Sequence, residues 1–148
     1  MLFRSYLLVY DFDNSPAVRK LAGRIAAERG LHIYSVFKIP YAERCFSLCG
    51  PENFLGLVQG ADFVLSNSFH ATAFSVIFER EFAVVERTEK INTRMRDFTT
   101  MLGLSDHMVT TETEIPAGTD WTAVRRCLKD EIDHAKAYID EVLRDVER

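Results

Sequence analysis

The sequence predicts a doubly wound α/β domain, in which helices cover both faces of a mostly parallel sheet. Short apolar runs alternate along the chain with segments of helical periodicity, as strands and crossover helices do. The first run, residues 6–10, is continuously apolar, which is typical of a strand buried on both faces of a parallel sheet. With 148 residues, 47% of them hydrophobic, the chain suits one sizeable core, so we expect a single domain over residues 1–148.

A strand–helix–strand unit opens the chain. After the strand at residues 6–10, Ser15 and Pro16 are placed to begin a helix, and Gly30 is placed to end it. A right-handed crossover makes the next strand, residues 31–37, parallel to the first. The further expected elements are a loop at 38–50, helices at 52–60, 69–80 and 90–102, and strands at 61–66, 82–86 and 107–110. This alternation predicts a Rossmann-like sheet.

The clearest helix closes the chain. It begins near Trp121, where Asp120 or Thr119 can cap it. Its apolar residues recur at helical spacing among charges: Val124, Leu128, Ala135, Ile139, Val142 and Val146. We expect this long amphipathic helix to dock on its own domain rather than to form a coiled-coil seam.

Composition narrows the classes of partner. The net charge of −4 argues against nucleic acid, because phosphate-backbone binding normally requires a basic surface. No apolar run reaches the roughly 20 residues of a bilayer span, and no secretory signal pattern opens the chain, so we expect a cytoplasmic protein. The cysteines Cys45, Cys49 and Cys127 have no metal-site or disulfide spacing, and we expect reduced thiols and no metal.

The polar turn after the third expected strand is the first candidate site. Ligands of open α/β sheets bind outside the carboxyl ends of the strands, and an apolar strand here ends in a polar turn that leads into a helix. The unpaired amides and dipole of that helix favour an anion, with Ser68 as N-cap. The surrounding polar residues are Ser66, Asn67, His70 and Thr72, of which His70 can donate to an anion or transfer a proton. A purely structural role, with Ser68 capping a helix and His70 partly buried, explains the residues alone equally well.

Two other groups of polar residues are candidates for a functional role. Asp11 and Asp13 follow the first strand with the spacing of the aspartates in haloacid dehalogenase-like phosphatases, but no lysine or acidic pair completes that pattern. A polar turn that caps the first helix is the alternative for this pair. Several cations follow the fourth strand, and we select Arg94 as the one that would bind an anionic donor.

The string of residues from 50 to 79 resembles the polysaccharide pyruvyl transferase family. The similar segments are Gly50-Pro51-Glu52-Asn53-Phe54-Leu55, Ala61-Asp62 and Ser66-Asn67-Ser68-Phe69-His70-Ala71-Thr72-Ala73-Phe74-Ser75. The similarity continues through the helix around Arg94, the turn at residues 102–104 and the start of the terminal helix at Asp120-Trp121.

The resemblance implies the C-terminal, donor-side lobe of a two-lobed, GT-B-like transferase. Such enzymes transfer a pyruvyl group from phosphoenolpyruvate to a sugar of a surface polysaccharide, without a metal or another cofactor. His70 would then contact the donor or transfer a proton, with Ser66, Asn67, Ser68, Thr72 and Arg94 as binding residues. The sugar would be presented by an N-terminal lobe, a separate chain or another copy in a homo-oligomer.

Two departures from the family pattern leave a non-catalytic binding module of the same fold as the alternative. The family's glycine after the histidine is Ala71 here, and its methyl group is expected to crowd the site. The family's enzymes carry an N-terminal lobe before such a segment, and we expect this lobe to need one that is missing here.

Overall fold

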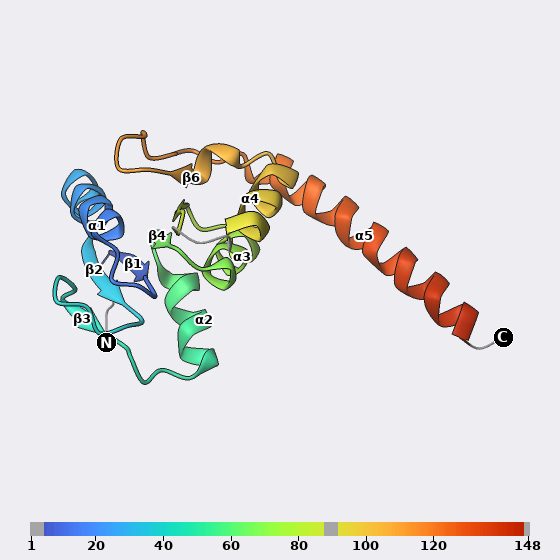
Figure 1. Ribbon diagram of the computed structural model, residues 1–148, viewed down its shortest axis with the longest axis horizontal. Helices are drawn as coiled ribbons and strands as arrows, with labels where there is room; N and C mark the ends of the chain where they lie inside the picture. The colour runs from blue at the N-terminus through green and yellow to red at the C-terminus, as the bar shows by residue number, and fades with distance from the viewer. Residues whose placement is uncertain (1–4, 88–91, 147–148) are drawn as a thin grey trace.

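The computed structural model describes residues 5–87 and 92–146 and contains a six-stranded sheet in the order β3-β2-β1-β4-β5-β6 (Figure 1). Every neighbouring pair of strands is parallel. The strands are β1 (Tyr6–Tyr10), β2 (His32–Ser35), β3 (Arg44–Cys45), β4 (Phe63–Ser66), β5 (Phe82–Val85) and β6 (Met108–Val109). The Rossmann-like fold predicted from the alternating pattern is confirmed.

Within the described residues, four α-helices lie between strands along the chain, and a fifth follows the last strand. They are α1 (Pro16–Arg29), α2 (Pro51–Gly60), α3 (Phe69–Ile77), α4 (Asn92–Met101) and α5 (Trp121–Val146), with a 3-10 turn, η1, at Ser105–His107. The expected start of α4 at residue 90 lies outside the described residues. The sequence-based expectation missed β3 within residues 38–50, because this two-residue edge strand is exposed and has no apolar pattern.

The side chains of the sheet alternate between two cores. Leu7 and Val9 of β1 pack with Val18, Leu21 and Ile25 of α1 on one face. The opposite core contains Tyr6 and Leu8 of β1, Leu57 and Val58 of α2, Ala71 and Val76 of α3, Met95 of α4, and Val124 of α5. Figure 1 shows α1 on one side of the strands and α2 and α3 on the other. Both faces of the sheet are therefore covered, as the continuous apolar strands predicted.

The terminal helix does not dock on the domain along its whole length, in contrast to the expectation. Val124 is 4% exposed, but every residue from Lys129 to Val146 is exposed, and α5 extends away from the sheet (Figure 1). The predicted docking is therefore wrong beyond residue 128, because the helix diverges from the apolar surface that could cover its stripe. None of the helices in the described ranges is long and apolar enough to cross a membrane.

Candidate functional site

The strand order places a topological switch point between β1 and β4. The chain runs from β1 outward through β2 to β3 and then returns to place β4 on the other side of β1. The carboxyl ends of these two strands lie in register, with Tyr10 opposite Ser66. The turns that follow them therefore diverge from one crevice, which is the usual ligand position in an open α/β sheet.

Asp11 organises the turn after β1. Its side chain is 2% exposed, and its Oδ2 accepts a hydrogen bond of 2.7 Å from the Ser15 amide at the start of α1. Its Oδ1 accepts from the Asp13 amide at 3.1 Å and from Asn67 Nδ2 at 2.8 Å. Ser15, expected to cap α1, makes no side-chain capping bond. The carboxylate thus caps α1 and ties the β1 turn to the β4 turn, which favours a structural role over that of a phosphatase nucleophile.

Three of the predicted binding residues shape the turn after β4. Ser66, Asn67 and Thr72 are between 1% and 3% exposed. The Ser66 hydroxyl accepts from the Ser68 amide at 3.4 Å, and the Thr72 hydroxyl donates to the Ser68 carbonyl at 2.9 Å. Asn67 Oδ1 accepts from the Phe12 amide at 3.1 Å. Internal hydrogen bonds therefore engage these polar groups and hold the backbone that leads into α3.

Ser68 is the exception in this turn. It occupies the N-cap position of α3 with an extended backbone (φ −118°, ψ 133°), but its hydroxyl makes no capping bond. Ser68 Oγ is buried and has no hydrogen-bond partner among the described residues. Burial raises the pKa of Tyr10, and an interaction of its hydroxyl with the Ser68 side chain acts against that rise, although no hydrogen bond of standard geometry joins the two groups. An unsatisfied buried hydroxyl beside the free amides of a helix start is suited to a ligand or an ordered water.

His70 lies in the first turn of α3 and is exposed. It lines a cavity of about 390 Å³ whose wall is largely aromatic, with Tyr10, Phe37, Phe54 and Phe74 among its residues. The ring centroids of Tyr10 and Phe37 are 5.0 Å apart, and those of Phe54 and Phe74 are 6.0 Å apart. The imidazole therefore borders a cavity that is apolar on one side and adjoins the α3 amino terminus on the other.

The sequence did not identify these aromatic residues as part of the site. Phe74 follows His70 by four positions, so helical spacing places both on one face of α3, and this signal could have found it. Tyr10, Phe37 and Phe54 come from β1, the segment after β2, and α2. Their convergence depends on which strands become neighbours, which the sequence pattern alone does not state.

Arg94 approaches the same helix start from α4. Its guanidinium lies 5.5 Å from the centroid of the Phe69 ring, and Phe69 directly precedes His70. Arg87 pairs with Asp13 at 2.7 Å, and Arg96 pairs with Glu86, whereas Arg94 has no ion pair among residues 5–87 and 92–146. Arg94 does not itself line the His70 cavity. Of the cations described after β5, it is the one that remains available to an anion near α3.

The methyl group of Ala71 is in the core. Ala71 is 0% exposed and packs in the cluster that includes Val76 and Val84. It is not among the residues that line the His70 cavity. The substitution of the family's glycine therefore adds packing on the sheet side of α3, in contrast to the crowding expected from the sequence.

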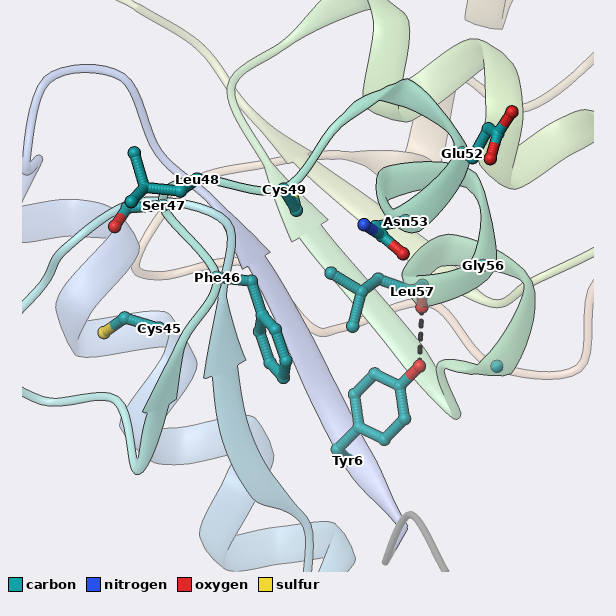
Figure 2. A pocket seen from close by; sticks show the side chains of 11 residues that line it. Tyr6, Cys45, Phe46, Ser47, Leu48, Cys49, Glu52, Asn53, Gly56 and Leu57 are labelled. Atoms are coloured by element: carbon teal, nitrogen blue, oxygen red, sulfur yellow. Dashed lines mark hydrogen bonds between the residues drawn. The ribbon is translucent and has the colours of Figure 1, made fainter. Parts of the chain in front are cut away.

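A second and larger cavity, of about 670 Å³, lies beside the first and shares Ser47 and Cys49 with it. Figure 2 shows Phe46 directed toward Tyr6, with α2 on one side and the 45–49 segment on the other. The Tyr6 hydroxyl donates to the Leu57 carbonyl at 2.7 Å, and burial raises the pKa of Tyr6 to about 12. This cavity reaches the amino end of β1 and lies away from the α3 start, so we assign the candidate site to the smaller cavity.

The cysteines and the acids within the described residues do not form a recognisable ligand set. Cys45, Cys49 and Cys127 are free thiols. In the part of the chain that the structure describes, no three His, Cys, Asp or Glu side chains are grouped as metal ligands would be.

The fold and the edge site define a Rossmann-like α/β protein with an anion-suited helix start at its switch point. The family model for polysaccharide pyruvyl transferase matches residues 2–89, more than half of the chain. The chain therefore belongs to the polysaccharide pyruvyl transferase family. The match covers β1 through β5 and ends before α4 and α5. No curated protein and no solved structure shows significant similarity to the chain.

Proposed function

We propose that this chain is the donor-binding lobe of a transferase that moves a pyruvyl group from phosphoenolpyruvate to a sugar of a surface polysaccharide. The observation that carries the proposal is the start of α3 at the switch point, where the buried Ser68 hydroxyl has no hydrogen-bond partner among the described residues and exposed His70 follows in the first turn. Membership of the pyruvyl transferase family supplies the class of reaction. We place the reaction in the cytoplasm and assign it no metal and no further cofactor.

The proposed donor has two anionic groups, and the helix start is suited to such a molecule. Backbone amides and the helix dipole attract a phosphate or a carboxylate, and the Ser68 hydroxyl can add a hydrogen bond. Arg94, 5.5 Å from the Phe69 ring, provides a nearby guanidinium for the second anionic group. Ser66, Asn67 and Thr72 contribute by holding this backbone in place, since their side chains bond within the turn.

The reaction assigns a specific task to His70. Ketal formation converts the methylene carbon of phosphoenolpyruvate into a methyl group, so that carbon must gain one proton. Two acceptor hydroxyls lose their protons as their oxygens bond to the central carbon, and inorganic phosphate leaves with the second proton. We assign the protonation of the methylene carbon to the His70 imidazolium, because histidine changes its charge near neutral pH.

The acceptor belongs to a different part of the assembly in this proposal. The resemblance implies a GT-B-like cleft between two lobes, and we assign the sugar to a second lobe that faces the carboxyl edge of this sheet. The aromatic wall of the His70 cavity would then lie at the boundary between donor and acceptor.

Calorimetric titration of phosphoenolpyruvate into this chain and its variants tests the donor site. His70→Ala removes a charge-assisted contact, so we expect binding to weaken roughly 10- to 100-fold. His134→Ala is the matched control, because His134 is an exposed histidine of α5 outside the cavity. Absence of binding by the native chain, or equal binding by the native chain and His70→Ala, would contradict the proposal.

A non-catalytic binding module of the same fold is the second candidate. It is favoured by the internal hydrogen bonds of Ser66, Asn67 and Thr72, which leave few free polar groups around the donor. The two candidates differ in turnover. Release of inorganic phosphate from phosphoenolpyruvate, dependent on a saccharide acceptor and a companion lobe, identifies the transferase. Tight binding without phosphate release identifies the module.

A further inference from the structure

Among residues 5–87 and 92–146, the contacts that anchor the terminal helix α5 to the domain come from its first two turns. Val124 is buried in the core, and the partly buried side chains of Trp121 and Leu128 pack against the same core. Asp120 Oδ1 caps the helix by accepting from the amides of residues 122 and 123, each at 3.1 Å. Arg125 adds an ion pair of 2.8 Å with Glu79. From Lys129 onward the helix leaves the domain, so about 27 Å of helix is surrounded by solvent.

The solvated part of α5 carries an apolar stripe. Several of its residues are large and exposed: Ile132 at 43%, Ile139 at 53%, Val142 at 42% and Val146 at 78%. Most of the stability of a helix in a protein comes from the packing of its amphipathic face, and a contiguous exposed apolar surface usually marks an interaction site. The stripe therefore requires an occupant that the described residues do not provide.

The spacing of the stripe identifies the kind of occupant. Its residues are separated by four, three, four, three and four positions: Leu128, Ile132, Ala135, Ile139, Val142 and Val146. This is a heptad repeat in which Ile132, Ile139 and Val146 occupy a positions, and the other three occupy d positions. A stripe confined to a and d positions matches the narrow seam of a coiled coil, whereas a helix that packs on a globular surface usually carries a wider apolar face.

We propose that α5 is a dimerisation element, and that residues 128–146 of two copies of this chain form a parallel, two-stranded coiled coil. β-Branched residues at a positions together with Leu at d positions favour two strands. Every a position of the stripe is β-branched, and Leu128 supplies the d position beside the domain, while Ala135 and Val142 occupy the other two. The proposal is independent of the pyruvyl transferase assignment, since none of these residues lines the His70 cavity.

The charges that flank the stripe select the second copy and its direction. In a parallel pair, each g position faces the e position of the next heptad in the other copy. Glu131, at g, then faces Lys136 of the second copy, and these carry opposite charges. Tyr138, at g, faces Leu143 of the second copy, and both are exposed, at 65% and 57%. The flanking positions are thus complementary to the helix itself when two copies run in parallel.

The antiparallel arrangement that pairs the whole stripe is unfavourable. It brings Lys136 of one copy beside Lys136 of the other, and Glu131 of each copy beside Asp145. Like charges that face each other at the flanks of a seam repel, and this repulsion disfavours the antiparallel pairing. The same six-residue stripe therefore has one direction that the charges support.

The anchor of α5 leaves the candidate site accessible in the dimer. Glu79 and Glu81 precede β5 and hold Arg125 and Thr119, so α5 starts from the amino edge of the sheet. The His70 cavity is at the carboxyl edge. Parallel pairing joins two copies at this amino edge and leaves both carboxyl edges free.

Sedimentation equilibrium of the chain from about 1 μM to about 500 μM tests the proposal. We expect a monomer–dimer equilibrium. Ile139→Glu places a charge in the seam, and we expect it to raise the dissociation constant at least about 100-fold. Ala137→Glu is the matched control, because position 137 is exposed on the outer side of the same helix and should leave dimerisation unchanged. Circular dichroism of both variants verifies that the domain is folded.

Charge reversal tests the direction of the pair. Glu131→Lys places the new lysine against Lys136 of a parallel partner, so we expect roughly three- to tenfold weaker association. Adding Lys136→Glu should restore it. In the antiparallel pair, Glu131→Lys alone would instead strengthen association through Asp145. A chain that stays monomeric throughout, an Ile139→Glu variant that dimerises like the native chain, or stronger association of Glu131→Lys overturns the proposal.

Discussion

Asp11 and Ser68 are both buried polar residues at the carboxyl edge of the sheet, yet their hydrogen bonding differs. Asp11 accepts from two amides and from Asn67, so its carboxylate is well compensated by donors. Ser68 Oγ has no hydrogen bond of standard geometry among the described residues, although its side chain interacts with the Tyr10 hydroxyl strongly enough to oppose the rise in the pKa of Tyr10. Native proteins leave few buried polar groups unsatisfied, and such exceptions concentrate where a ligand or water completes the site.

A third buried polar residue, His107, should make stability depend on pH. It is 2% exposed, its ring is 4.4 Å from that of Phe82, and its Nδ1 donates to the Phe82 carbonyl at 2.9 Å. Burial lowers the pKa of His107 below 6.5, against the smaller opposing effects of that hydrogen bond and of Asp106 and Glu81. The unfolded chain therefore binds the proton more readily than the folded chain.

Acidification should consequently destabilise the protein through His107. The stability that the neutral imidazole provides is complete above about pH 6.5 and is lost as the pH falls toward the lowered pKa of the folded state. Urea unfolding at several pH values between about 5 and 7 measures this loss. His107→Gln, which keeps a donor but does not titrate, should flatten the profile, and exposed His134→Gln should not. A profile of His107→Gln as steep as that of the native chain would contradict this origin.

The first helix offers a test of how local signals operate. Gly30 ends α1 in a left-handed conformation (φ 64°, ψ 35°), and its amide donates to the Ala26 carbonyl. Gly23 lies within the same helix, and a Cβ atom added at either glycine would meet no neighbouring atom within 4 Å. The two glycines therefore differ in backbone conformation rather than in available space.

Alanine substitution should have opposite effects at these two positions. Gly30→Ala imposes a left-handed alanine and should lower the free energy of unfolding by about 1 kcal/mol. Gly23→Ala removes conformational freedom from the unfolded chain and should raise it by roughly 0.5–1 kcal/mol. Urea unfolding of the two variants measures both values. Changes of the same sign would show that the left-handed turn does not control the end of α1.

The ends of α1 and α3 show which element boundaries are readable from sequence. Gly30 marked the end of α1 correctly, because glycine favours the left-handed conformation. The end of α3 was predicted near Arg80, but the helix ends at Ile77. Glu79 takes the left-handed conformation there with φ 53°, and the Arg80 amide donates to the Ser75 carbonyl at 2.8 Å. A glutamate gives no stop signal, so the local sequence does not predict this end.

At the scale of the whole molecule, the domain and the solvated part of α5 should be energetically separate. A chain ending at Leu128 retains buried Val124 and the ion pair between Arg125 and Glu79. Its free energy of unfolding should equal that of full-length Ile139→Glu within about 0.5 kcal/mol, a comparison that removes any contribution from association. Urea unfolding provides the measurement.

A chain ending at Asp120 is the contrasting truncation. It loses the burial of Val124 and the packing of Trp121, and should be less stable by about 3 kcal/mol. If both truncations lowered stability equally, residues 129–146 would have to contact the domain, contrary to their exposure.

The sequence by itself determined the features that depend on neighbours along the chain. Continuous apolar strands and crossover helices predicted the parallel α/β sheet, and the segment from Ser66 to Thr72 predicted a polar helix start. A cap of α5 was expected from Asp120 or Thr119, and Asp120 provides it. Each signal is local, since it arises from periodicity, backbone conformation or capping within a few residues.

Only the tertiary structure decided what depends on distant residues meeting. Strand order placed Tyr10 beside Ser66, created the aromatic wall at His70 and left Ser68 Oγ without a partner among the described residues. The tertiary structure also shows α5 extending away from the sheet, so the apolar stripe that was expected to dock on the domain is exposed instead. An amphipathic pattern states that a face requires burial, but the surface that buries it is set by how the whole chain and its partners pack.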